Sequence, residues 1–356
     1  MMKNIIATIT FHRALNCGAV LQSYALQKYI ESLKCDSEVI DYRCPKVEEA
    51  YRIFRKTKNL RDMISVVIYF PIKIVKKYKF SKFKKTYLKQ SLKCNTHEEL
   101  MKLSKKYKTV IVGSDQVWNL EITGKDKAFF LDFCDKDKRV AYAASVGNNS
   151  LFLQNEKLYK DDLNKFKGIS VREKSVSEKM GVLLGRKIST VVDPVFLLDR
   201  EEWERMIDAK GENSPYIFSY CLHEKKVYEE TQRISDRKSL PIVCVPSNFK
   251  CPIKGKIKRT MGPIEFLTMI RNAEYIVTDS FHAIAFSIIF NKKFIPVLKN
   301  DYKELNERIL SLMDVCGLTD LFYQKEILFE QLNYNDVNSR LKVEIDKSKL
   351  FLKNNI

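Results

Sequence analysis

The sequence has no long apolar run. None of its segments reaches the roughly 18 apolar residues that a membrane-spanning helix needs, and the longest candidate, residues 63–72, has about half that length. The apolar run at residues 5–10 is too short for a secretory signal, and His12 and Arg13 follow it closely. These absences argue against a membrane-spanning or secreted protein, and we expect a cytoplasmic one.

Two cofactor-binding motifs are also missing. The nine cysteines are irregularly spaced, odd in number and without a CxxC pair, which is typical of reduced thiols in a cytosolic protein rather than of a zinc site. We therefore expect no metal. The loop after the first apolar run contains no GxGxxG pattern, so the fingerprint of dinucleotide binding is absent.

Acidic residues are scarce in one part of the chain. The net charge is +19, and residues 43–108 alone hold 20 Lys and Arg against 5 Asp and Glu. In this segment the apolar residues 63–70 precede a run of lysines: Lys73, Lys76, Lys77, Lys79, Lys82, Lys84 and Lys85. Such a helix is typical of attachment to anionic lipid, at about 1 kcal/mol per lysine. We expect residues 63–90 to contact a membrane surface, with a solvated basic face and nucleic-acid binding as the alternatives.

The length of 356 residues, at roughly 100–200 residues per domain, predicts two domains. Apolar strands alternate with helical patterns from residue 5, and a new alternation begins at residue 216. Because this pattern favours parallel sheets, we expect an α/β protein whose two sheets face a cleft. The predicted parts are an N-terminal domain at 1–200 that carries the basic segment 43–108, a C-terminal domain at 213–330, and a closing helix at 331–356.

Residues 274–297 predict a ligand site in the second domain. They form the pattern strand, polar turn, apolar helix and strand, so the turn lies at the carboxyl end of a strand, where open α/β sheets bind ligands. Asp279 or Ser280 can cap the helix. His282 lies in its first turn, beside unpaired backbone N–H groups that favour an anion. The alternative is that Asp279 and Ser280 only cap the helix and that His282 satisfies a buried carbonyl.

Three further segments of the first domain follow expected strands. One is the polar, glycine-containing loop at residues 12–18, and the second is GSDQVWN at 113–119, behind the all-apolar strand 109–112. The alternative for the second is a capped turn with Trp118 in the core. The third places Arg172 where a strand gives way to a helix. Arginine suits a bidentate contact to carboxylate or phosphate, although Arg172 could equally pair with Glu173 or Glu178.

Six motifs, taken in order, resemble the polysaccharide pyruvyl transferase family. They lie at residues 16–27, 112–119, 142–147, 170–173, 191–198 and 277–290, and the likeness spans roughly 5–320. The resemblance implies two Rossmann-like domains in a GT-B-like arrangement. It also implies transfer of a pyruvyl group from phosphoenolpyruvate to two hydroxyls of a sugar, with release of phosphate and no cofactor. One position departs: Ser280 stands where family members of better-known activity carry an arginine.

The resemblance and the loop positions together suggest roles for individual residues. The acceptor would be a sugar of a cell-surface glycan or of its lipid-linked precursor. We expect the catalytic residues to be His282, Asp115 and Arg172. Donor contacts are expected from Arg172, Ser280, His282, Asp279 and Ser114, and acceptor contacts from Asn16, His12 and Gln116. The competing interpretations are a GT-B glycosyltransferase that uses a nucleotide sugar and a non-enzymatic basic protein that binds membranes or nucleic acid.

Overall fold

The structure is a computed structural model. It describes residues 4–50, 60–147, 149–207, 215–223, 225–247, 251–298, 303–319 and 332–356, with the backbone alone for 60–68 and 303–305. The predicted domain limits at 213, 330 and 331 lie outside the described residues, and so do the side chains of residues 63–68.

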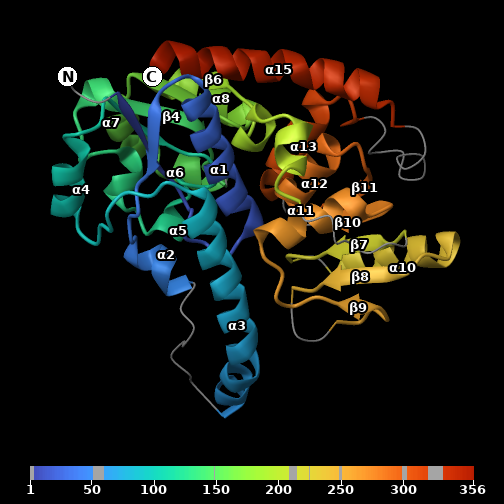
Figure 1. Ribbon diagram of the computed structural model, residues 1–356. Coiled ribbons are helices and arrows are strands. Elements are labelled where there is room, and N and C mark those ends of the chain that lie inside the picture. Colours follow the sequence, from blue (N-terminus) through green and yellow to red (C-terminus); the bar gives the residue numbers. More distant parts are fainter. Residues whose placement is uncertain are drawn as a thin grey trace. The chain divides into compact units, whose positions relative to one another are not determined.

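The chain divides into two compact units. The first consists of residues 1–56, 81–198 and 343–356, and it contains both ends of the chain (Figure 1). The second consists of residues 57–80 and 199–342. Two helices, α3 (Leu60–Tyr87) and α15 (Tyr334–Asn355), contain a border between units. The prediction had assigned all of 43–108 to the first domain, whereas residues 57–80 group with the second unit.

The first unit is built on a parallel sheet. Among the described residues the strand order is β2-β1-β3-β4-β5-β6. The strands are β1 (Ile5–Ile9), β2 (Asp36–Val39), β3 (Thr109–Val112), β4 (Arg139–Ala144), β5 (Gly168–Val171) and β6 (Ser189–Thr190). Every residue of β3 and β4 is buried, as expected for strands with both faces covered. Because all pairs are parallel, the loops that follow the strands share one edge of the sheet.

Helices connect these strands. They are α1 (Cys17–Ser32), α2 (Pro45–Ala50), α4 (His97–Ser104), α5 (Leu120–Thr123), α6 (Asn149–Gln154), α7 (Glu156–Leu163) and α8 (Lys174–Leu184), with 3-10 turns η1 (Lys127–Phe130), η2 (Lys136–Lys138) and η3 (Pro194–Leu197). Asn16 begins α1 by accepting a hydrogen bond from the Ala19 N–H at 3.2 Å. Helix α1 buries most of its length and packs against β2 and η3, which fixes the loop before it at the carboxyl edge.

The second unit repeats the α/β plan. Its described strands follow the order β11-β10-β7-β8-β9, and all their pairs are parallel. The strands are β7 (Ile217–Tyr220), β8 (Ile242–Val245), β9 (Lys256–Ile257), β10 (Tyr275–Thr278) and β11 (Lys293–Pro296), and the helices are α9 (Arg200–Glu204), α10 (Lys226–Lys238), α11 (Pro263–Asn272), α12 (Phe281–Ile289) and α13 (Lys303–Val315). Helix α12 is apolar except for His282 and Ser287 and is almost wholly buried, so it occupies the interior.

The α/β alternation predicted from the sequence is confirmed in both units. Residues 274–297 form β10, α12 and β11, in the predicted order. The short strand β9 and the 3-10 turns had not been predicted, because segments of two to four residues carry no usable periodicity. None of the helices in the described part of the chain is both long and apolar enough to cross a membrane.

Gly113, directly after β3, is required by its surroundings. Its φ is +123°, and a Cβ atom there would lie 2.1 Å from the Tyr142 carbonyl oxygen. Gly185, which ends α8, also has a positive φ of +64°, but a Cβ atom would meet nothing within 4 Å. Substituting each glycine by alanine therefore distinguishes two contributions to the free energy of unfolding: the strain of a positive φ, present at both positions, and a steric clash with the backbone, present only at Gly113.

We predict that Gly113→Ala lowers the free energy of unfolding by about 3 kcal/mol or more, because strain and overpacking add. Gly185→Ala should cost about 1 kcal/mol, since only the left-handed conformation is penalised. Urea unfolding of both variants checks this difference. Equal losses would show that the Tyr142 carbonyl moves aside at no cost.

Candidate functional site

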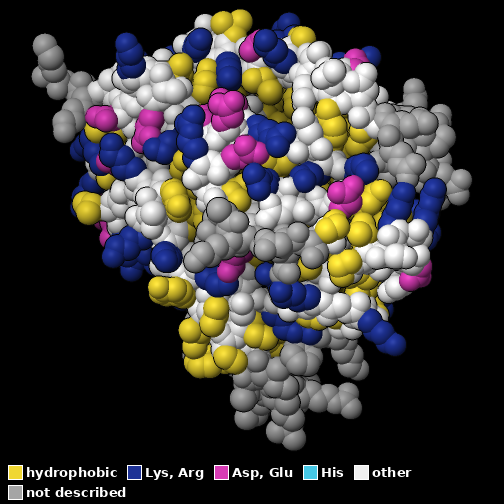
Figure 2. Space-filling model, turned by 45° about the vertical axis from the view of Figure 1, so that its right-hand side comes forward, with side chains coloured by type: hydrophobic (Ala, Val, Ile, Leu, Met, Phe, Trp, Pro, Cys, Tyr) yellow, Lys and Arg dark blue, Asp and Glu magenta, His cyan; other side chains and the backbone are white. Residues whose placement is uncertain are grey.

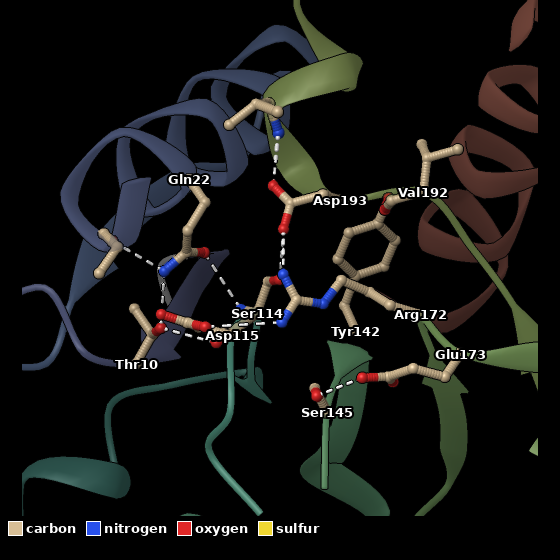
Figure 3. Close-up of polar contacts among 12 residues, drawn as sticks. Thr10, Gln22, Ser114, Asp115, Tyr142, Ser145, Arg172, Glu173, Val192 and Asp193 are labelled. Atoms are coloured by element: carbon tan, nitrogen blue, oxygen red, sulfur yellow. Dashed lines mark hydrogen bonds and ion pairs between the residues drawn. The ribbon is translucent and has the colours of Figure 1, made fainter. Parts of the chain in front are cut away.

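Polar side chains from three loops meet at the carboxyl edge of the first sheet (Figure 3). Ser114 and Asp115 follow β3, and Arg172 follows β5. Arg172 Nη2 lies 3.5 Å from Asp115 Oδ1, and Arg172 Nη1 donates to Asp193 Oδ2 at 2.5 Å. Ser114 Oγ donates to the same Asp193 oxygen at 3.1 Å. The structure therefore joins three predicted site residues around Asp193, for which the sequence had suggested no role.

Arg172 is held as a buried cation. Its side chain is 3% exposed and that of Asp193 is wholly buried. Burial alone would lower the pKa of the guanidinium, but the charges of Asp193, Asp115 and Glu173 outweigh burial and raise it, so Arg172 stays charged. One cation and the two carboxylates that it contacts sum to −1. The positive charge of Arg172 is therefore neutralised by Asp193 and Asp115, and this group has no surplus positive charge for a bound anion.

Helix α1 helps to hold this group in place. The Gln22 side chain is fully buried; its Nε2 donates to Thr10 Oγ1 at 2.8 Å, and its Oε1 accepts from the Ser114 N–H at 3.2 Å. Thr10 Oγ1 in turn donates to the Ser114 carbonyl at 3.0 Å. Figure 3 shows these groups on one side of Ser114, with Arg172 and Asp193 nearby. Gln22 lies in the motif at 16–27, but it was assigned no role because its partners Thr10 and Ser114 are on other segments of the chain.

Asp115 has an unusual backbone. Its φ is +73°, in the left-handed region that few residues other than glycine, asparagine and aspartate adopt. Its carbonyl accepts hydrogen bonds from the N–H groups of Val117 at 2.8 Å and Ser145 at 3.0 Å, which fix this conformation. The Asp115 side chain is 15% exposed, compared with 3% for Arg172. Asp115 is thus the member of this group that another molecule can reach, and such backbone outliers cluster at functional sites.

The rest of the 113–119 loop makes contacts within the protein, and an acceptor contact by the partly exposed Gln116 stays a prediction. Trp118 is fully buried and donates from Nε1 to the Phe129 carbonyl at 3.0 Å, so the alternative that placed it in the core is correct. Asn119 caps α5 by accepting from the Glu121 N–H at 3.1 Å. The predicted acceptor residue Gln116 accepts from Asn119 Nδ2 at 3.0 Å.

A second buried carboxylate, Glu173, lies next to Arg172. Glu173 is 3% exposed, and its Oε1 accepts a hydrogen bond from Ser145 Oγ. The other oxygen, Oε2, is buried and has no hydrogen-bond partner among the described residues. Ser145 directly follows β4, so this hydrogen bond joins the end of β4 to the residue before α8.

The predicted acceptor residues Asn16 and His12 follow β1 and contact other groups of the first unit, and their contact with an acceptor stays a prediction. Asn16 caps α1, as described above. His12 is 1% exposed; its Nδ1 donates to the Thr10 carbonyl at 3.2 Å, and its Nε2 lies 3.4 Å from Asp41 Oδ1. Burial lowers the pKa of His12 despite the neighbouring Asp41. For Asp41 burial acts to raise the pKa, but hydrogen bonds from His12 and Arg43 hold it well below its ordinary value.

In the second unit, only one of the two residues predicted to cap α12 does so. Ser280 caps α12 by accepting from the Ala283 N–H at 3.4 Å. Asp279 instead accepts from the N–H groups of Leu222 at 2.8 Å and His223 at 2.7 Å, so it ties the turn to the end of β7. His282 is 7% exposed and sits in the first turn of α12. These three residues therefore cluster at the carboxyl end of β10, as predicted.

The described residues contain no group of three or more His, Cys, Asp or Glu side chains that could hold a metal ion. All nine cysteines are free thiols, and the closest described pair, Cys244 and Cys251, has its sulfur atoms 3.6 Å apart. The absence of a metal requirement stays a prediction.

The lowered pKa of His12 makes stability depend on pH. Below about pH 6.5 the unfolded chain binds a proton at this residue that the folded chain resists. The contribution of His12 is therefore fully present above pH 6.5 and is lost as the pH falls through the folded pKa. We predict that the urea midpoint falls more between pH 7.5 and pH 5.5 in the wild type than in His12→Gln.

The matched control is His97→Gln: the His97 side chain is 46% exposed, so solvent screens its 3.6 Å ion pair with Asp132. Its midpoint should follow that of the wild type over the same pH range. Parallel pH profiles for wild type and His12→Gln would contradict the predicted linkage.

Solved structures similar to this chain share its fold. The UDP-N-acetylglucosamine 2-epimerase of Rickettsia bellii matches with a TM-score of 0.50 and 11% identity, covering 99% of this chain and 97% of that chain. MnaA of S. aureus, solved with UDP, matches with a TM-score of 0.51 and 11% identity, covering 96% of this chain and 91% of that chain. Arabidopsis thaliana UGT89C1, complexed with UDP-L-rhamnose, matches with a TM-score of 0.52 and 10% identity over the whole of both chains. These are GT-B-type enzymes, and the predicted GT-B-like fold class is confirmed.

Sequence comparisons are more specific. The family model for polysaccharide pyruvyl transferase matches residues 16–302, which is most of the chain. None of the curated proteins matches the chain. The match includes each of the three predicted segments, at 112–119, 170–173 and 277–290, that carry the residues described above.

Proposed function

Because the chain belongs to the polysaccharide pyruvyl transferase family, we propose that it transfers a pyruvyl group from phosphoenolpyruvate to a sugar. The acceptor would belong to a cell-surface glycan or to its lipid-linked precursor. The product is a ketal that bridges two sugar hydroxyls, and phosphate is released. The observation that carries this proposal is the family match over residues 16–302, which contains both clusters of polar residues.

The proposed chemistry requires a proton donor and a base. Protonation of the methylene carbon of phosphoenolpyruvate makes the adjacent carbon electrophilic, and one sugar hydroxyl attacks that carbon while losing its proton. A second hydroxyl then displaces phosphate and closes the ketal. No electrons are exchanged with a cofactor. One of the two protons lost from the hydroxyls is taken up at the methylene carbon, and the other leaves on the released phosphate.

Particular residues suit these steps. His282, in the first turn of α12, is proposed as the general acid or phosphate contact, because a helix N-terminus favours anions and imidazole can donate a proton or a hydrogen bond. Asp115 is proposed as the base toward the acceptor hydroxyl, because it is the exposed carboxylate of its group. Arg172 Nη2 lies 3.5 Å from Asp115 Oδ1 and so holds the carboxylate in position. A direct donor contact by Arg172 and Ser114 stays a prediction.

We predict that phosphoenolpyruvate raises the melting temperature of the protein and that His282→Gln reduces this rise. A ligand at a hundredfold excess over Kd stabilises by about 2.7 kcal/mol, which a thermal-unfolding measurement detects. With glycan fractions as acceptors, His282→Gln should also lower phosphate release by about 10²-fold. His97→Gln is the control and should behave as the wild type does.

Arg172→Lys is a better test of the arginine than Arg172→Ala. Removing the charge altogether would leave the buried Asp193 unpaired, at a cost of about 3–5 kcal/mol, and would confuse folding with binding. If Arg172 contacts the donor, Arg172→Lys should retain a folded protein and bind phosphoenolpyruvate more weakly.

A glycosyltransferase that uses a nucleotide sugar is the second candidate. It is favoured by one departure in this chain, the neutral Ser280 in place of an arginine in the turn before α12, and by the uridine nucleotides in two of the similar structures. The same thermal measurement separates the candidates. A rise with UDP-glucose or UDP-N-acetylglucosamine, without one from phosphoenolpyruvate, would overturn the pyruvyl-transfer proposal.

We further propose that α3 attaches the enzyme to the inner face of the cell membrane. Helix α3 exposes 42% of Ile74, 40% of Val75 and 66% of Tyr78, and Lys77 beside them is exposed too. Lys79 instead forms an ion pair with Glu265, so it contributes less to such a face. Figure 2 shows Lys and Arg side chains across the visible face of the molecule, in larger number than the Asp and Glu side chains among them.

Replacing Lys77, Lys82 and Lys85 by Gln should weaken binding to anionic vesicles by about 3 kcal/mol, at about 1 kcal/mol per lysine. Co-sedimentation with vesicles of phosphatidylglycerol and phosphatidylcholine measures this loss. The control replaces the exposed Lys342, Lys347 and Lys353 of α15 by Gln, which removes the same amount of charge. If both triple variants bind as well as the parent protein, α3 is not the attachment site.

A further inference from the structure

A second charged cluster lies at the carboxyl edge of the first sheet, beyond β1 and β2. Arg13 Nη1 lies 3.1 Å from Asp41 Oδ1, and Arg13 also forms a two-point contact with Glu48 of α2 through Nε and Nη2. Arg43 Nη2 lies 3.0 Å from Asp41 Oδ2. The buried ring of His12 contacts Asp41 from another direction. Both carboxylates of this cluster are therefore already engaged.

Lys84, near the end of α3, adds a third cation. Among the described residues its ammonium group has no hydrogen bond and no ion pair, although Arg13, Arg43, Asp41 and Glu48 all act on it electrostatically. Burial, followed by the like charge of Arg13, lowers the pKa of Lys84 to about 8. With His12 neutral, three cations face two carboxylates. The cluster thus carries a surplus positive charge in a partly buried place.

The cluster remains accessible to a ligand. The exposed fractions of the side chains are 17% for Arg13, 29% for Arg43 and 13% for Asp41, so the charges are neither sealed in nor fully hydrated. Arg43 Nε is buried and has no hydrogen-bond partner among the described residues. Buried donors and a partly desolvated lysine are costly without a partner, and an anion would supply one.

We propose that Lys84, Arg43 and Arg13 bind an anionic substituent, a carboxylate or a phosphate, carried by the acceptor sugar. The cluster lies at the ends of β1 and β2, and Asp115 lies at the end of the neighbouring β3. With strands about 4.8 Å apart, an anion there would be roughly 10 Å from Asp115. A sugar whose hydroxyl is at Asp115 can therefore place a charged substituent on the cluster. This assignment to the acceptor rests on the proposed function.

The contrast with Arg172 supports the choice of this cluster. Arg172 and the two carboxylates that it contacts sum to −1, whereas the Lys84 cluster sums to +1. Among the described residues at this edge of the first sheet, the excess of positive charge lies in the loops that follow β1 and β2. An acidic or phosphorylated sugar is then favoured over a neutral one.

The test measures the reactivity of the Lys84 amine in the whole protein. Acetic anhydride at pH 8 labels neutral amines, and mass spectrometry compares the labelling of Lys84 with that of the exposed Lys85. The probes are glucose 1-phosphate and glucuronate, with glucose as the neutral probe at the same ionic strength. Both anions should reduce the labelling of Lys84 by about tenfold, because a bound anion favours the protonated amine. Glucose should not do so, and labelling of Lys85 should not change.

Charge variants supply a second readout. In the wild type, protection of the site by these anions should fall as the pH rises above about 8, since Lys84 loses its proton. Binding of glucose 1-phosphate, followed by calorimetry, should persist to pH 9.5 in Lys84→Arg, which keeps its charge. Affinity at pH 7.5 should fall about tenfold in Lys84→Met and stay unchanged in Lys105→Met, which removes an exposed lysine after α4.

Unchanged labelling of Lys84 with both anionic probes would overturn the proposal. Protection by phosphoenolpyruvate but by neither sugar anion would overturn the assignment to the acceptor. Protection by the sugar anions, together with no thermal shift from phosphoenolpyruvate, would leave this site in place and overturn the pyruvyl-transfer proposal instead.

Discussion

The buried contact between Arg172 and Asp193 organises the candidate site of the first unit. It joins the end of β5 to the segment after β6, and Asp193 also accepts from Ser114 and from the Val195 N–H that begins η3. Neither charge is stable alone in this interior, so each fixes the other. Asp115 depends on this contact indirectly, since its carboxylate faces a guanidinium that cannot turn away.

Charge is distributed unevenly along the same edge of the sheet. The group around Arg172 carries one more carboxylate than cations, whereas the cluster around Lys84 carries one more cation than carboxylates. A base and an anion site can therefore lie on neighbouring loops without neutralising each other. In the second unit, Asp279 is used to tie two strand ends together, which leaves His282 and the N-terminus of α12 as the features suited to an anion.

Much of the fold was predictable, because its elements follow strong local patterns. The run TVIV at 109–112 and the apolar helix 281–289 could only be buried, and their spacing fixed a parallel α/β plan. The motifs also located Ser114, Asp115, Arg172 and His282. Gln22 and Asp193 were not assigned a role, and Lys84 was predicted only as part of the membrane-facing lysine run. The partners of these residues lie on other elements, which the sequence cannot pair.

The sequence by itself determined the family, the alternation of strands and helices, and which loops follow strands, because these depend on residue type and short-range spacing. The tertiary structure decided which polar groups are already satisfied. His12 and Asn16 resemble ligand-facing residues in the sequence. In the folded protein His12 contacts Asp41, and Asn16 caps α1. Lys84 resembles its six neighbouring lysines, yet only its position against Arg13 and Arg43 changes its pKa. Burial and partner choice are long-range properties, and local spacing does not encode them.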